Sequence, residues 1–184
     1  MIRLTIGRKE QMKTRVPLEI VLAAGMAAVP AFAQTPLNLL NQLQRESLEA
    51  SSDAVQLQAE ARSNYLSWEA DADTLNSLKA DINGMGQTLA RLEQMRASET
   101  PEERQACDEA LPLLKKMAGN TSAAVRFLNE YQGRFWQPPY QSDVANLAGE
   151  ASRLKKDVGL YTKLANDRAS EKQIETTLGS EAGS

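Results

Sequence analysis

Histidine is absent from all 184 residues, and its absence excludes several classes of enzyme and metal site. Histidine is the commonest general base in proteins and the usual ligand of zinc and copper. Catalytic triads and Cys–His pairs both require it, and so do the four-helix di-iron sites that are built on Glu-x-x-His. The chemistries that remain must rest on other side chains.

Cysteine is almost as scarce, because Cys107 is the only one in the chain. A single cysteine cannot form an intramolecular disulfide, a Cys-x-x-Cys redox motif or a cysteine-rich metal site. Residues 105–108 have ordinary helical character, so we interpret Cys107 as a small residue on a helix face. An intermolecular disulfide is the alternative interpretation.

Carboxylates are the remaining candidates for metal ligands or paired acids. They lie close together in three places: Asp71 with Asp73, Glu102 with Glu103, and Asp108 with Glu109. None of these pairs has the spacing of a calcium-binding loop. The first pair fits a solvated helix face, and the second fits a helix N-terminus, where the helix dipole favours acids. We therefore expect a protein that is not an enzyme and that holds no metal or other cofactor.

Long apolar runs are also scarce, apart from one near the N-terminus. Residues 16–29 are mostly apolar, and Ala31-Phe32-Ala33 follows before Gln34. Five basic residues precede this run: Arg3, Arg8, Lys9, Lys13 and Arg15. A basic region, an apolar region and an A-x-A motif in this order are typical of a secretory signal peptide. We expect residues 1–33 to be removed by cleavage near Ala33-Gln34.

Two alternatives remain open for the leader. Translation from Met12 would give a leader of more ordinary length. An uncleaved membrane anchor is the competing interpretation, but the apolar run is shorter than the ~20 residues that a spanning helix needs. We expect a periplasmic or secreted protein whose mature part has no membrane span.

The mature part also lacks a concentrated basic stripe. Without residues 1–33, 16 basic and 22 acidic side chains remain, which is a net charge of −6. Binding to a phosphate backbone requires clustered Lys and Arg, so nucleic acid is not an expected partner.

Strand signals are nearly missing, because no run alternates with a period of two residues. Apolar residues instead recur every three or four positions, which predicts an all-α fold with three main helices. The first is expected from about Leu37 to Ala97. The second is expected from Pro101 to about Trp136, since Thr100 and Glu103 form a capping-box pattern. Pro112 should bend it.

The third helix is expected after a turn at Gln137-Pro138-Pro139-Tyr140, with Ser142 and Asp143 as candidate N-caps. It fades towards Leu178, so we interpret 34–178 as one helical bundle domain and 179–184 as a disordered tail.

Short turns make neighbouring helices antiparallel, so the chain should form a long antiparallel bundle with coiled-coil character. A first helix of 60 residues would be about 90 Å long, against about 54 Å for the other two. Residues 37–58 should then overhang and meet another chain, unless the helix breaks near Ser51-Ser52 and folds back.

These considerations suggest two candidate interaction surfaces. The overhang carries a leucine stripe: Leu37, Leu40, Leu43 and Leu48. The end of the bundle that this overhang passes should gather six aromatic residues: Tyr65, Trp68, Tyr131, Phe135, Trp136 and Tyr140. Aromatic residues can form a binding surface or close the end of a bundle.

We expect an exported, non-enzymatic helical protein that acts by binding another protein or itself. The alternative is a periplasmic small-ligand-binding or sensor-type bundle with a pocket lined by Trp68 and Trp136.

Overall fold

The computed structural model describes residues 35–63, 68–131, 134 and 136–181. The described chain forms four α-helices and one short 3-10 turn: α1 (Pro36–Arg62), α2 (Trp68–Gln94), η1 (Arg96–Ser98), α3 (Pro101–Glu130) and α4 (Pro138–Glu181). No strand occurs among the described residues, so the predicted all-α fold is confirmed. The expected signal peptide lies outside the described residues.

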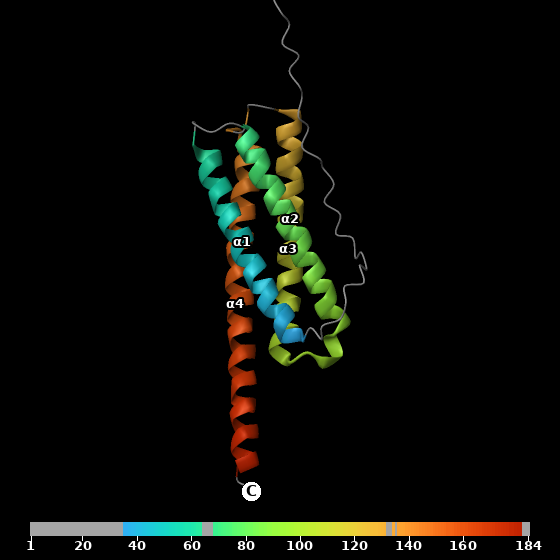
Figure 1. The fold of residues 1–184 in the computed structure, drawn as a ribbon. Coiled ribbons are helices and arrows are strands. Elements are labelled where there is room, and N and C mark those ends of the chain that lie inside the picture. The colour runs from blue at the N-terminus through green and yellow to red at the C-terminus, as the bar shows by residue number, and fades with distance from the viewer. Residues whose placement is uncertain (1–34, 64–67, 132–133, 135, 182–184) are drawn as a thin grey trace, which may run out of the picture.

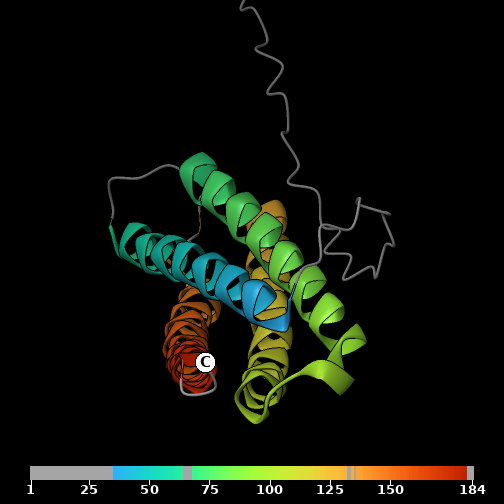
Figure 2. The ribbon, with the colours of Figure 1, turned by 60° about the horizontal axis from the view of Figure 1, so that its bottom comes forward.

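The four helices run alternately up and down and pack side by side (Figure 1). Each helix lies next to its neighbours in the order α1, α2, α3, α4, and α4 closes the ring against α1. With the bottom of the bundle turned forward, α1 lies beside α4 and α2 lies beside α3 (Figure 2). In the described part of the chain, no helix has the length and apolar character needed to cross a membrane.

Side-chain caps begin two of the helices. Thr35 accepts a hydrogen bond from the backbone N–H of Asn38 at the start of α1. At the start of α3, Thr100 accepts from the N–H of Glu103, and the Glu103 carboxylate accepts from the N–H of Thr100 at 2.6 Å. The predicted capping box is confirmed, and it satisfies two donors that a helix N-terminus leaves unpaired.

The prediction of one helix from Leu37 to Ala97 is wrong, because the chain reverses direction after Arg62. Ser63 has extended backbone angles. The Thr88 hydroxyl donates to a carboxylate oxygen of Glu46 at 3.0 Å, although the two residues are 42 positions apart. In one continuous helix they would lie about 63 Å apart. The reversal also lies later than Ser51, which is buried inside α1.

The second turn differs from its prediction in detail. The third α-helix ends at Glu130, before the expected Trp136, and α4 begins at Pro138, before the expected caps Ser142 and Asp143. Prolines fit the first turn of a helix, because the N–H groups that they lack would be unpaired there. The described chain is helical through Glu181, so residues 179–181, which were expected to belong to a disordered tail, are part of α4.

The core is a continuous seam of Leu, Ala, Val and Met side chains from all four helices. A few small polar residues are buried with them, such as Ser47, Thr88 and Thr162. Pro112 lies inside α3 on its exposed side, and the helix continues past it.

Candidate interaction surface

The overhang predicted for the first helix belongs instead to the C-terminal part of α4. With 44 residues α4 is about 66 Å long, whereas the other helices have 27 to 30 residues and are about 40–45 Å long. Ala165 is its last buried residue, and every described residue from Asp167 to Gly179 is exposed. Figure 1 shows α4 extending well past the other three helices.

Two polar contacts mark the place where α4 leaves the bundle. The Asn166 amide donates to the side-chain oxygen of Asn41 on α1 at 3.1 Å. The Arg168 guanidinium forms an ion pair with Glu102 on α3 at 2.8 Å. These contacts hold the helix at the start of its projecting part.

Six residues of α4 form an outward-facing row that we call the distal stripe: Leu160, Leu164, Asp167, Glu171, Ile174 and Leu178. Their steps of four and three residues place them on one helix face. Leu160 is 53% exposed, whereas Val158 and Thr162, two positions away on either side, are each 1% exposed. The distal stripe therefore points away from the core.

Exposed apolar side chains are concentrated on this stripe. Nine large hydrophobic residues are exposed among the described residues, and Leu160, Leu164, Ile174 and Leu178 are four of them. Ile174 and Leu178 are 59% and 60% exposed. Single exposed leucines are normal on a protein surface, so the alignment of four apolar residues on one helix face is what makes this stripe a candidate interaction site.

The charged side chains of the projecting helix give it mixed support. At a spacing of four residues Asp167–Glu171, Arg168–Lys172 and Glu171–Glu175 are like-charged, whereas at a spacing of three residues Arg168–Glu171 and Lys172–Glu175 are oppositely charged. The last turn carries no basic residue to offset the helix dipole. An unsupported helix of this length is marginal in water, so a partner that covers it would stabilise it.

The predicted leucine stripe on α1 is largely core. Leu40 and Leu43 are fully buried and Leu37 is partly buried against the core, while Leu48 is 48% exposed. The expectation that they overhang is wrong, because the reversal after Arg62 returns α1 to the bundle. Its apolar face then packs against α4 and α2.

At the predicted aromatic end, some of the aromatic side chains are buried in the core and others are exposed to solvent. Tyr140 is fully buried, and Trp68 packs against the core. Tyr131 and Trp136 are 44% and 59% exposed. Tyr65 and Phe135 lie outside the described residues. The sequence interpretation missed Phe127, whose ring centroid is 5.0 Å from that of Tyr131 and 5.8 Å from that of Tyr140.

Asp71 at this end is buried, so its assignment to a solvated helix face is wrong. The Tyr140 hydroxyl donates to the Asp71 carboxylate at 2.7 Å. Burial raises the pKa of Asp71 from 3.8 to about 6; the hydrogen bond opposes this change, and the nearby Glu60 adds to it. Burial also raises the pKa of Tyr140, which keeps the phenol protonated as the donor.

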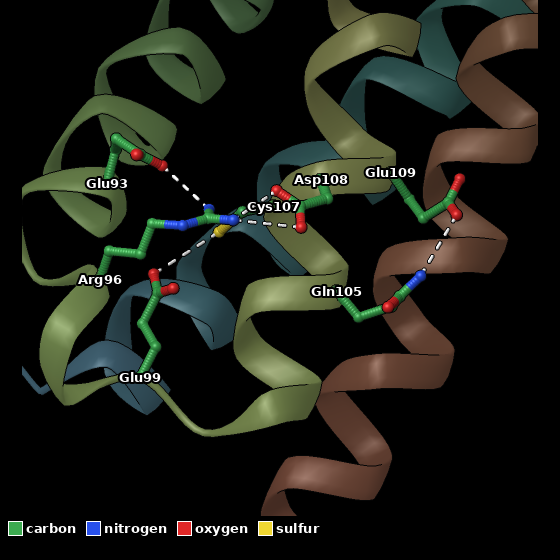
Figure 3. A network of polar contacts seen from close by, with 7 residues as sticks. All are labelled: Glu93, Arg96, Glu99, Gln105, Cys107, Asp108 and Glu109. Atoms are coloured by element: carbon green, nitrogen blue, oxygen red, sulfur yellow. Dashed lines mark hydrogen bonds and ion pairs between the residues drawn. The ribbon is translucent and has the colours of Figure 1, made fainter.

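A polar network holds the turn between α2 and α3 (Figure 3). Arg96 bridges Glu93 at 3.0 Å and Asp108 at 2.9 Å. Behind this bridge the Cys107 thiol donates to the Glu99 carboxylate at 3.7 Å. Burial raises the pKa of Cys107 to about 12, so its reactive thiolate is scarce. An intermolecular disulfide would require this turn to open.

Among the described residues, no group of three or more Cys, Asp or Glu side chains is arranged to hold a metal ion. Glu103 serves the capping box, and Asp108 serves the Arg96 bridge. Within the described chain, the distal stripe is thus the strongest candidate site. No protein-family model, curated protein or solved structure matches this chain.

Proposed function

We propose that this chain is an exported, non-enzymatic helical protein that acts by binding another protein through the distal stripe of α4. The distal stripe carries the proposal, because its apolar residues face solvent on a helix that extends beyond the other three helices of the bundle. Export is supported by the basic, apolar and A-x-A order of residues 1–33. The lack of histidine supports a role without catalysis.

The partner should pack along α4 as a second helix. The alternating steps of four and three residues are the repeat that two helices share in a coiled coil. Burying a large aliphatic side chain completely contributes about 1.5–3 kcal/mol, and these four are already half-buried, so together they would contribute about 3–6 kcal/mol. Association itself costs a similar amount, so apolar contact alone would give only weak binding.

The alternative of a small-ligand site between Trp68 and Trp136 gains no support from this end of the bundle. Tyr140 is fully buried there and Trp68 packs against the core, so these two aromatic residues contribute to core packing and not to the lining of a ligand site.

Photo-crosslinking in the native cells tests the interaction. A photoreactive residue at position 174 should give an adduct with another protein, whereas one at Lys115, an exposed position on α3, should not. The substitution Leu178→Asp, one turn further along the stripe, should weaken the adduct at position 174. Absence of any adduct from the distal stripe would contradict the proposal.

Fractionation tests the location. The protein should be recovered outside the cytoplasm with Gln34 as its N-terminal residue, as read by N-terminal sequencing. An intact leader on a cytoplasmic protein would contradict export.

A further inference from the structure

We propose that the distal stripe binds an amphipathic helix of a different protein, whose apolar face carries two basic residues one turn apart, opposite Asp167 and Glu171. This inference rests on the proposed function and specifies the partner's chemistry.

The carboxylates lie in the middle of the stripe, between two apolar pairs. Leu160 and Leu164 precede them, and Ile174 and Leu178 follow. Asp167 and Glu171 are exposed, so water solvates both charges in the free protein. A helix that covers the apolar residues on both sides must also cover the carboxylates. Removing these charges from water is costly unless cationic groups replace the solvent.

The surroundings make the centre of the stripe negative. Glu171 has Asp167 one turn before it and Glu175 one turn after it, so three carboxylates follow one another along the helix. A partner that approaches this face therefore meets the two stripe carboxylates directly, with Glu175 at one edge of the stripe and Lys163 at the other.

The basic residues of α4 itself do not balance these charges. Arg168 is already paired with Glu102 at 2.8 Å. Lys172 lies about 120° around the helix from the middle of the stripe, so it points to a different side of α4. Lys163 lies one turn before Asp167, at the edge of the stripe and two turns from Glu171. Cationic groups that contact Glu171 from the solvent side of the distal stripe must therefore come from the partner.

A second copy of this chain does not supply them. In an antiparallel pair, Leu160 would face Leu178 of the other copy, Leu164 would face Ile174, and Asp167 would face Glu171. In a parallel pair Asp167 would face Asp167 of the other copy, and Glu171 would face Glu171. Both arrangements place four carboxylates at the centre of the interface, and opposed like charges in an interface cost several kcal/mol. The charge pattern thus favours a basic partner over self-association.

Two synthetic helical peptides test the inference against the mature protein, residues 34–184. Both carry leucine at four positions with the spacing of the apolar residues of the stripe. The first peptide has lysine at the two central positions, and the matched control has glutamate there. Fluorescence anisotropy should show that the lysine peptide binds about tenfold or more tightly than the control, with a preference that weakens at high salt.

The double variant Asp167→Lys/Glu171→Lys should reverse the preference. Both residues are exposed and lie beyond the core, so thermal unfolding of the variant should match that of the parent. Equal binding of both peptides to both proteins would overturn the basic-partner inference and leave the proposed function standing. Failure of both peptides to bind either protein would overturn both.

Self-association is tested separately by light scattering. Asp167→Leu/Glu171→Leu completes the apolar row and should convert a monomer into a dimer. A parent protein that already dimerises, and loses the dimer in the Leu178→Asp variant, would overturn the inference.

Discussion

Replacing Asp71 by asparagine should stabilise the protein at neutral pH, although it removes a charged hydrogen-bond acceptor. The unfolded carboxyl titrates near 3.8, and the folded one near 6. At about 1.4 kcal/mol per pH unit, this difference corresponds to about 3 kcal/mol. The asparagine oxygen can still accept the hydrogen bond from Tyr140, but its NH2 group is a new buried donor, which costs about 1–2 kcal/mol when it is left unpaired. The net expectation at pH 7 is a gain of about 1–2 kcal/mol in the free energy of unfolding.

The sign of the pH dependence follows from the raised pKa. Between pH 4 and 6 the folded protein keeps a proton on Asp71 that the unfolded chain releases. The stability of the parent protein should therefore fall as the pH rises through this window, and return on acidification. Burial raises the pKa of Asp81 to about 6 as well, with Asp53 and Glu49 adding to it, so both proteins will share part of the slope. The difference between the two proteins isolates the contribution of Asp71.

Urea unfolding at pH 4, 5, 6 and 7 measures this difference. The gap between Asp71→Asn and the parent should grow from pH 4 to pH 7. Asp73→Asn is the matched control, because Asp73 is exposed on the same turn of α2 and should leave the curve unchanged. A variant that is less stable at pH 7, or a gap that does not change with pH, would refute the reasoning that burial dominates at Asp71.

Three further predictions concern other parts of the chain. Thr100→Ala should lower the free energy of unfolding by about 1 kcal/mol in urea titrations, because it removes the cap of α3; Thr176→Ala, at an exposed helix position, should not lower it. Cys107 should resist iodoacetamide at pH 8 in the native protein and react in urea, as mass spectrometry would show. Deleting residues 170–184 should leave the thermal unfolding midpoint within about 2 °C, because no described side chain there is buried.

Local signals in the sequence are sufficient for some of the fold. The capping box at Thr100 depends on residues three positions apart, and the sequence predicts it correctly. The helical character of all the main segments follows from the apolar period and the missing strand signals. These features require no knowledge of what lies across the core.

The reversal after Arg62 cannot be predicted in the same way. Ala61 and Trp68 lie seven positions apart, so the apolar row keeps its phase through the turn. A core-facing row looks the same in one long helix as in two helices that fold back on each other. The pattern consequently assigns the overhang to α1 and interprets its leucines as a surface, although most of them are core.

Burial of Asp71 depends on distant residues as well. Its partner Tyr140 lies 69 positions away, and only the assembled end of the bundle brings them together. On α4, the spacing of Val158, Tyr161 and Leu164 predicts one core-facing row, but Leu164 is 45% exposed.

The pairing of α1 with α4 has a consequence for the order of events during synthesis. The hydrogen bond between Asn41 and Asn166 joins residues 125 positions apart, so the first helix is translated long before its neighbour exists. At 5–20 residues per second, α1 waits about 6–25 s for the chain that covers it. Leu40 and Leu43 stay without that cover throughout the interval, and such distant contacts also slow the final closure. The bundle can therefore close only after the part of α4 that carries Asn166 has been synthesised.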